Sequence, residues 1–127
     1  MEIPGKLLYS QEHTWARDRN GKCFVGITAY AQDQLGEIIY VELPAVGDNV
    51  EEGNSFGVVE SLKAVSDLLA PISGEVLEVN GALEDGPELV NSDPYGGGWM
   101  IAVAIADDAE LKNLMTAEQY KSLIEED

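Results

Sequence analysis

The sequence has few basic residues. Its 7 Lys and Arg residues stand against 24 Asp and Glu residues, which gives a formal net charge of −17. Surfaces that bind nucleic acid or anionic lipid need clustered Lys and Arg, so this charge excludes both classes of ligand. It favours protein partners with basic faces, because long-range attraction speeds their encounter. The same charge would also keep the chain soluble, and charge alone does not decide between these two roles.

Cysteine, histidine and long apolar runs are also scarce. The only cysteine, Cys23, excludes a disulfide within the chain, and the only histidine, His13, leaves no Cys and His cluster for zinc. No apolar run approaches the roughly 20 residues of a membrane-spanning helix, and residues 1–10 have neither signal-peptide nor transit-peptide composition. We therefore expect no metal and no membrane, and a bacterial-type cytoplasmic location.

The sequence does contain a succession of short strand-like segments. Its length of 127 residues predicts a single domain over residues 1–127. Asn20-Gly21 supplies the positive φ angles of a tight hairpin, and turn residues separate the later segments. Residues 82–98 are polar and glycine-rich, and we expect a long ordered loop there. The pattern predicts a mainly β sandwich or barrel, with strands over residues 13–17, 23–27, 37–43, 56–60, 66–70, 75–79 and 99–105.

Helices are expected at two places. Thr28 can cap a short internal helix over residues 29–35, which Gly36 would end in the left-handed conformation. A C-terminal helical segment covers about residues 107–125. Within it, residues 116–119 have the Thr-x-x-Gln pattern of a capping box.

A lysine interrupts the apolar run VVESLKAVSDLLAPISG at residues 58–74. A strand–turn–strand with Lys63 at the turn would hold its amine clear of the body. If an external enzyme supplies an activated acyl group, such an amine needs no lowered pKa. It needs only to extend far enough to enter that enzyme's active site. On spacing alone, with Glu60 and Asp67 on either side, the simpler interpretation is a solvated lysine near acidic neighbours.

A catalytic site is not indicated. Ser61 or Ser66 could be combined with His13 and Asp67 as a triad, but no nucleophile elbow or oxyanion glycine pattern accompanies them. The glycines at 96–98 lack the Gly-Lys-Ser/Thr of a phosphate loop, and we expect a turn. We therefore expect no catalytic residue and no metal ligand.

Three segments together resemble one known family. Residues 59–80, VESLKAVSDLLAPISGEVLEVN, resemble the lipoyl-attachment segment of glycine cleavage system H proteins. Residues 25–48 (VGITAYAQDQLGEIIYVELPAVGD) and 88–99 (ELVNSDPYGGGW) are similar to that family in the same order. The resemblance covers roughly residues 7–125. It implies a barrel-sandwich hybrid of lipoyl-domain type: two small antiparallel sheets with a short internal helix and C-terminal helices.

The resemblance also implies a role for Lys63. This residue would carry lipoic acid in amide linkage, in a non-catalytic carrier of the glycine cleavage system. The lipoyl arm takes an aminomethyl group from glycine decarboxylase (the P protein) and presents it to the aminomethyltransferase (the T protein). Dihydrolipoyl dehydrogenase (the L protein) then reoxidises the arm. Lipoylating enzymes would recognise the attachment hairpin through Glu60, Ser61 and Asp67, and the carrier would act as a monomer.

The resemblance also implies a groove that shelters the cargo, and at one position of this groove the chain differs from most H proteins. Glu12, His13, Thr14 and Asp67 match positions that line a groove for the cationic amine of the cargo. H proteins usually have His-Glu-Trp where this chain has His-Thr-Trp, so a hydroxyl replaces a carboxylate at Thr14. The alternative is therefore an H-like lipoate carrier of another pathway, such as heterodisulfide-reductase-like sulfur oxidation or lipoyl relay. A biotin carrier is disfavoured, because its lysine lies between two methionines.

Overall fold

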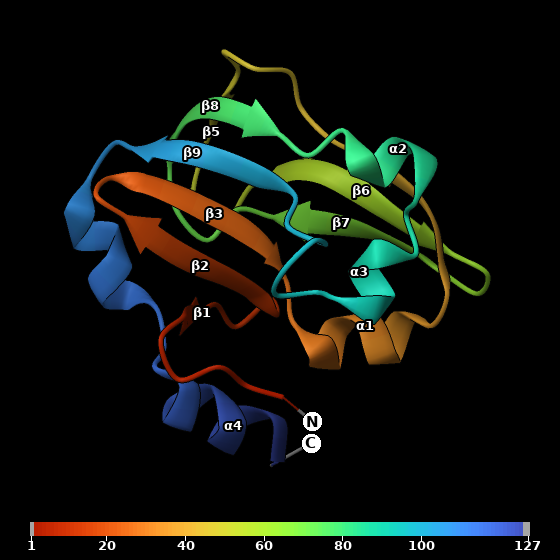
Figure 1. Ribbon diagram of the computed structural model, residues 1–127. Helices are drawn as coiled ribbons and strands as arrows, with labels where there is room; N and C mark the ends of the chain where they lie inside the picture. Colours follow the sequence, from red (N-terminus) through yellow and green to blue (C-terminus); the bar gives the residue numbers. More distant parts are fainter. Residues whose placement is uncertain (1, 126–127) are drawn as a thin grey trace.

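The computed structural model describes residues 2–125 and contains two antiparallel sheets (Figure 1). The six-stranded sheet has the order β1-β2-β3-β9-β8-β5, and the three-stranded sheet has the order β4-β6-β7. The mainly β expectation is therefore confirmed. The strands are β1 (Leu8–Tyr9), β2 (Thr14–Arg19), β3 (Lys22–Ile27), β4 (Ile38–Glu42), β5 (Asn49–Val50), β6 (Ser55–Ser61), β7 (Val65–Leu69), β8 (Gly74–Val79) and β9 (Ile101–Ile105).

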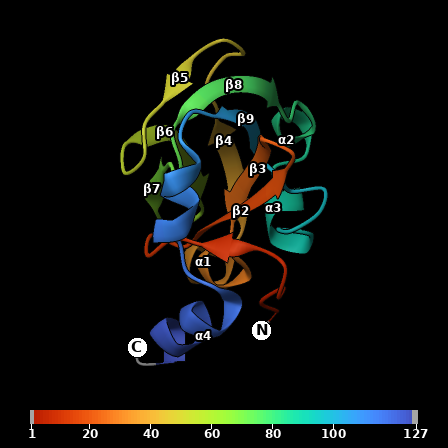
Figure 2. The ribbon, with the colours of Figure 1, turned by 90° about the vertical axis from the view of Figure 1, so that its left-hand side faces the viewer.

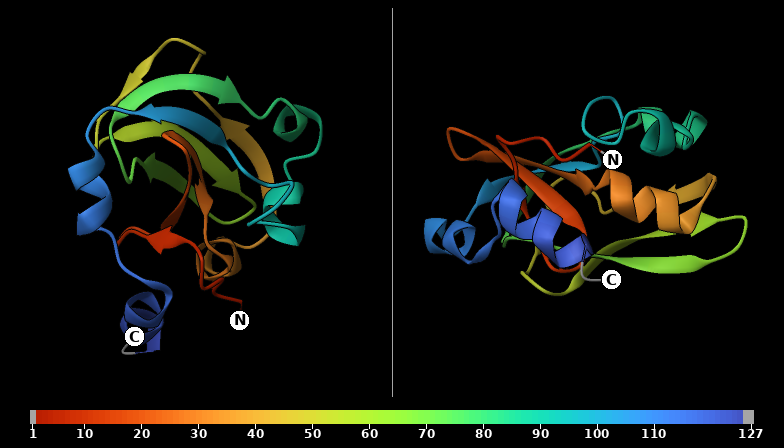
Figure 3. Two further views of the ribbon diagram at one scale, coloured as in Figure 1. Left: turned by 60° about the vertical axis from the view of Figure 1, so that its left-hand side comes forward. Right: turned by 90° about the horizontal axis from the view of Figure 1, so that it is seen from below.

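The main hydrophobic core lies between the two sheets, which curve around it (Figure 3, left). Alternate side chains of the paired strands point inward, as the period of two in a strand requires. Val25 and Val103 are fully buried from the six-stranded sheet, and Val59 and Leu68 contribute from the three-stranded sheet. Burial of these β-branched and leucine side chains is what holds the β6–β7 hairpin to the body.

A second, aromatic cluster joins the termini to the six-stranded sheet. Tyr9 of β1 stacks on Tyr120 of the C-terminal helix, with ring centroids 4.8 Å apart and planes 8° apart. The buried Trp15 contacts Tyr95 at 6.2 Å between centroids, and its indole N–H donates to the carbonyl of Pro94. This cluster explains why the C-terminal helix packs below the sheets, next to β1 (Figure 2).

The helices differ in part from the sequence prediction. They are α1 (Ala29–Leu35), α2 (Ala82–Asp85), α3 (Leu89–Ser92), the 3-10 helix η1 (Asp108–Asn113) and α4 (Ala117–Glu125). α1 has its predicted bounds and its Thr28 cap, and both hydrogen bonds of the Thr116–Gln119 capping box form. Within residues 2–125, no helix is of the length and apolar character that crossing a membrane requires.

Several boundaries in the sequence prediction are wrong. Residues 82–98 are not one loop, because α2 and α3 each form a single turn there. The closing strand begins at Ile101 rather than at residue 99, and β2 begins at Thr14 because His13 has a positive φ of 67°. Gly36 ends α1 with a φ of 83° and a ψ of −157°, so its φ is positive but its conformation is not left-handed helical.

Candidate functional site

Lys63 lies at the tip of the β6–β7 hairpin, as the sequence predicts (Figure 1). The last strand pair is Glu60 with Val65, and the amide of Ser61 donates to the carbonyl of Ala64 at 2.8 Å. Leu62, Lys63 and Ala64 are exposed. Seen from below, the hairpin projects beyond the rest of the molecule (Figure 3, right). A side chain at this tip can therefore enter the recess of another protein while the body remains outside.

The hydroxyl of Ser61 organises the turn that presents Lys63. It accepts hydrogen bonds from the amides of Ala64, at 3.1 Å, and Lys63, at 3.3 Å. The Ser61 side chain is buried, so its oxygen replaces water for two turn amides. Ser61 therefore orders the turn from within, and its predicted role in recognition of the hairpin stays a prediction. Because this hydroxyl is already engaged, it is also a poor candidate for the nucleophile of a triad.

The segment that joins α1 to β4 supports the tip from one side. The amide of Leu62 donates to the carbonyl of Glu37 at 3.2 Å. Gly36 lies against the aliphatic part of the Lys63 side chain, since a Cβ atom placed on Gly36 would be 3.6 Å from Lys63 Cε. The direction in which Lys63 leaves the hairpin therefore depends on where residues 36–38 are held.

Asn91 of α3 holds that segment in place. Its Nδ2 donates to the carbonyl of Gly36 at 2.8 Å and to Oε1 of Gln32 at 2.9 Å. Its Oδ1 accepts from the amide of Ile38 at 2.8 Å. No sequence signal identifies this role, because the partners are 53 to 59 positions away and meet only in the folded chain. The turn signals around Asn91 predict a loop and give no information about contacts to the hairpin.

The charges near Lys63 are carboxylates that do not pair with it. Within residues 2–125, the ion pairs join Lys22 to Glu78 and Lys121 to Glu125, and Lys63 takes part in none. Glu60 is half-buried and Asp67 is exposed on the same hairpin. The Lys63 amine is thus free of a competing ion pair, in surroundings that attract cationic groups.

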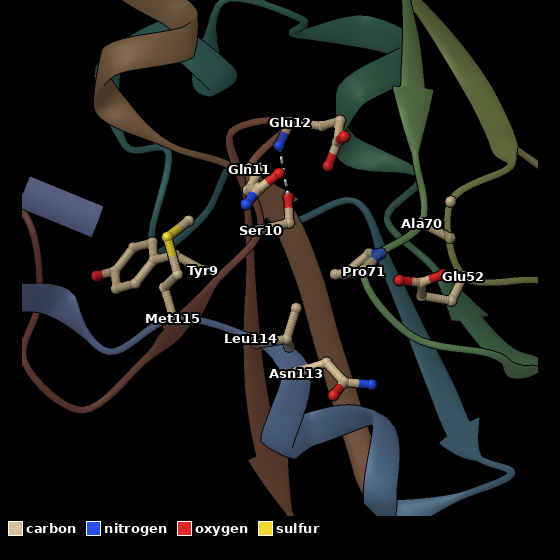
Figure 4. Close-up of a pocket in the computed structure, with 11 residues that line it drawn as sticks. Tyr9, Ser10, Gln11, Glu12, Glu52, Ala70, Pro71, Asn113, Leu114 and Met115 are labelled. Carbon is tan, nitrogen blue, oxygen red and sulfur yellow. Dashed lines mark hydrogen bonds between the residues drawn. The ribbon is translucent and has the colours of Figure 1, made fainter. Parts of the chain in front are cut away.

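A cleft lies between the loop before β2 and the turns at the other end of the β6–β7 hairpin (Figure 4). Glu12 forms one wall, and Glu52 lies on the opposite side. The floor is held by Tyr9 and Met115, whose backbones exchange hydrogen bonds of 2.9 and 2.7 Å. The lining residues are Tyr9, Ser10, Gln11, Glu12, Glu52, Gly53, Ala70, Pro71, Asn113, Leu114 and Met115.

The structure distributes the predicted groove residues over three environments. Of these residues, Glu12 alone lines the cleft. Thr14 is buried, and its hydroxyl is 2.6 Å from that of Ser10, which also accepts from the amides of Glu12 and Thr14. Asp67 lies further along β7, where Ser55 Oγ donates to its carboxylate at 3.5 Å. The Thr14 hydroxyl therefore shapes the loop that carries Glu12.

His13 is held by the aromatic cluster. Its Nδ1 is 2.8 Å from the hydroxyl of Tyr120, and its ring lies 4.8 Å from that of Tyr30. The Tyr120 hydroxyl is also 2.7 Å from that of Thr28, and burial raises the pKa of Tyr120 to about 12. Because the hydroxyl stays protonated at neutral pH, it can donate to one of these partners and accept from the other. The helix α4 thereby fixes both the loop before β2 and the start of α1.

Known proteins that are similar to this chain belong to one family. A family model described as "Glycine cleavage H-protein" matches residues 7–127. Among curated relatives, the glycine cleavage system H protein of Anaeromyxobacter sp. (strain K) is 57% identical, over 99% of this chain and 98% of its own length. That of Brevibacillus brevis is 52% identical, over 99% of this chain and 100% of its own length. The crystal structure of a glycine cleavage system H protein from Mycobacterium marinum matches with a TM-score of 0.84 and 41% identity, over 94% of this chain and 97% of that chain.

Proposed function

The chain belongs to the glycine cleavage H-protein family, and from this membership we propose that Lys63 carries its lipoyl group, in amide linkage to Nζ. The chain is a lipoyl carrier of the glycine cleavage system, with lipoic acid as its covalently attached cofactor. The observation that supports Lys63 is its position at the tip of a hairpin whose turn is held by Ser61 from within and by residues 36–38 from the side.

The other lysines fit the attachment less well. Lys22 pairs with Glu78 on the six-stranded sheet, and Lys121 pairs with Glu125 on α4. Lys112 lies in η1, and Lys6 lies near the N-terminus before β1. Lys63 combines an exposed position, a turn with defined geometry and an amine without an ion pair. An acylating enzyme needs these three properties in order to bind one lysine and pass over the others.

The chain's own residues position the arm and leave the chemistry to the cofactor. When bound, the lipoyl group would supply the redox-active disulfide to which the aminomethyl group is transferred. Lysine and lipoyl together span on the order of 14 Å, so the end of the arm can reach a partner's active site while the acidic body stays outside. In this proposal the attachment site is recognised through Glu60 and Asp67, and through Ser61 by way of the turn that its hydroxyl holds.

We further propose that the cleft beside Glu12 belongs to a groove that shelters the cargo. Its support is that two carboxylates from different segments, those of Glu12 and Glu52, line the same cleft (Figure 4). Both residues are exposed, and nearby carboxylates favour the charged form of an amine. Asp67 lies on β7 between this cleft and Lys63, in the direction in which the arm would fold back. In this proposal His13 and Thr14 position the loop, and Glu12 supplies the charge.

The carrier works with the enzymes of the glycine cleavage system. We propose that its successive partners are the P protein, the T protein and the L protein, after a lipoylating enzyme has loaded Lys63, and that it performs no catalysis itself. The net charge of −17 supports this sequence of brief contacts, because it speeds encounter with basic surfaces. It also opposes self-association, which supports a monomeric carrier.

The test is to lipoylate the purified chain and to map the modification. We expect the mass of one lipoyl amide, on the peptide that contains Lys63, and none after Lys63→Arg. Lys121→Arg serves as the matched control and should be modified like the wild type. The lipoylated chain should then support glycine–bicarbonate exchange with glycine decarboxylase, and should show no turnover alone. Modification at another lysine would refute the assignment of Lys63, and a lipoylated chain inactive with a cognate decarboxylase would contradict the carrier role proposed with that partner.

A further inference from the structure

The sheet face next to Lys63 is apolar and acidic in alternation. Tyr40, Glu60 and Val65 are paired across β4, β6 and β7, so their side chains lie in one row on the outer face. The neighbouring row, from the same pairings, is Glu42, Val58 and Asp67. The row between them, Val41 and Val59, is buried, which shows that these six side chains face away from the core. We call the six residues the outer face.

Large apolar side chains are exposed around this face. In residues 2–125, the exposed large apolar residues include Ile39, Tyr40, Leu62 and Val65, with exposed fractions of 47, 48, 71 and 68%. Leu62 adjoins Lys63 in the turn, and Val65 begins β7 just after it. Apolar side chains exposed to this extent beside a functional residue indicate a binding surface.

A β-bulge produces part of this exposure. The pairing of β4 with β6 shifts register between Ile38 and Tyr40. In a regular strand, Ile39 and Tyr40 would point to opposite faces. The bulge instead leaves both side chains exposed, while Ile38 and Val41 remain buried. Because a bulge re-aims side chains at a defined place, this one exposes two apolar groups beside Glu60 and Ser61, where β6 ends and the Lys63 turn begins.

We propose that the outer face is the docking surface for the enzyme that acylates Lys63, and that this enzyme presents an apolar contact flanked by basic residues. This rests on the proposed function of Lys63. Carboxylates of Glu42, Glu60 and Asp67 alternate with the apolar groups, so a partner with Lys and Arg in the complementary places gains attraction and orientation. A second copy of this chain would place carboxylates against carboxylates, so it is a poor occupant.

The short length of the unmodified lysine side chain is the reason for assigning the outer face to the acylating enzyme and not to the later partners. Its Nζ lies only about 6 Å from its Cα, so the enzyme's active site must close around the hairpin tip and touch Leu62 and Val65. An enzyme that receives the lipoyl arm can dock on the order of 14 Å away and need not cover this face. In the acylation step, Nζ bonds to the lipoyl carbonyl carbon of lipoyl adenylate, AMP leaves with the electrons of the broken bond, and Nζ releases a proton.

The experiment measures acylation of the full-length chain by an ATP-dependent lipoate–protein ligase, with lipoate and ATP as substrates. The test variants are Tyr40→Ser with Val65→Ser, and separately Glu42→Lys with Glu60→Lys. We expect KM for the carrier to rise about tenfold or more in each, with kcat unchanged. The apolar controls are Leu77→Ser on β8 and Val46→Ser, which are also exposed, and the charge control is Glu118→Lys on α4. Thermal unfolding establishes that every variant is folded.

Three results would overturn the inference. The first is a wild-type KM in both double variants. The second is an equal rise in KM in the control variants, which would show a general effect of composition or charge. The third is normal acylation followed by a raised KM in glycine–bicarbonate exchange, which would assign the face to glycine decarboxylase. Failure of the wild-type chain to accept lipoate at Lys63 is a different result, because it refutes the proposed function before the outer face is tested.

Discussion

The side-chain carbonyl of Asn91 accepts a hydrogen bond from the amide of Ile38 at 2.8 Å, at the residue where β4 begins beside the Lys63 hairpin. Ile38 is paired with Ser61, the residue that shapes the turn. Asn91 therefore connects α3 to the attachment hairpin through the first residue of β4. A side chain in a segment without a strong secondary-structure signal thus helps to set the position of the lysine.

Replacing Asn91 with alanine should loosen the hairpin tip. Asn91→Ala leaves the Ile38 amide and the Gly36 carbonyl without their partner, and each such loss costs about 1–3 kcal/mol if water does not replace it. We expect a lower unfolding temperature, faster hydrogen exchange of the Leu62 amide, and slower acylation of Lys63. NMR-detected exchange measures the second effect directly, because the Leu62 amide donates to Glu37.

The matched control for this change is Ser92→Ala, at the next position of α3, where the side chain is exposed. It should leave stability, exchange and acylation as in the wild type. If Asn91→Ala lowers the unfolding temperature but leaves the exchange of Leu62 unchanged, then Asn91 stabilises the fold without positioning the hairpin.

Replacing Ser61 with alanine should affect the turn more than the fold. Ser61→Ala removes the acceptor for the amides of Lys63 and Ala64, and we expect a loss of about 1 kcal/mol of stability. The exchange of these two amides should quicken and kcat/KM for acylation should fall. Ser66→Ala is the control on the same hairpin, since its hydroxyl makes only one long bond, of 3.4 Å, to a neighbouring carbonyl. Acylation of Ser61→Ala at the wild-type rate would show that the enzyme orders the turn itself.

The parts of the fold that the sequence predicts are those with local signals. The α1 helix has a capping threonine and a terminal glycine, and the β2–β3 hairpin has Asn20-Gly21 at its turn. The two-residue strands β1 and β5 carry too few residues for a periodic pattern, and they form because β2 and β8 offer them partners. The one-turn helices α2 and α3 are likewise set by tertiary contacts.

The same distinction applies to the site. The hairpin around Lys63 joins two strands that are neighbours in the sequence, so the sequence predicts its turn. The family resemblance then implies that the lysine at this turn carries the lipoyl group. The support from Asn91 and the bulge at Ile39 depend on pairings between distant segments, and no pattern in the sequence indicates them. The burial of Thr14 is a further case, since a threonine at the start of a strand has no preferred side of the sheet until its neighbours are placed.

Gly26 should be intolerant of alanine because of Trp15. The two residues are directly paired on β2 and β3, and a Cβ atom on Gly26 would lie 2.7 to 2.8 Å from three atoms of the indole. Overlap of this kind forces a buried side chain off its rotamer and typically costs about 1–3 kcal/mol. Chemical denaturation of Gly26→Ala should show this loss. Gly81→Ala is the control, because a Cβ there meets no atom within 4 Å and its φ of −64° suits alanine, so its stability should not fall.

Stability should fall at alkaline pH because burial raises the pKa of several groups, of which Cys23 and Tyr120 can be distinguished by substitution. Burial raises the pKa of Cys23 from 9.0 to about 12, and burial raises the pKa of Tyr120 from 10.0 to about 12. Burial also raises the pKa of Tyr9 and of Tyr95, which add to the fall above pH 10. Above its ordinary pKa, each group loses its proton in the unfolded chain but keeps it in the folded one, so the unfolded state binds fewer protons and stability decreases as pH rises. The contribution of Cys23 is therefore lost between pH 9 and about pH 12, and that of Tyr120 between pH 10 and about pH 12.

Each of two variants should remove a different part of this alkaline fall in stability. Cys23→Ala should flatten the plot of unfolding free energy against pH from pH 9 upward, whereas Tyr120→Phe should change its slope only above pH 10. Tyr120→Phe should also be less stable at neutral pH, because Thr28 and His13 lose their shared hydroxyl partner. Urea denaturation monitored by tryptophan fluorescence at several pH values measures both effects. A slope in Tyr120→Phe identical to that of the wild type above pH 10 would mean that this hydroxyl titrates alike in the folded and unfolded chains, and that the contact between α4 and the loop before β2 opens before the fold does.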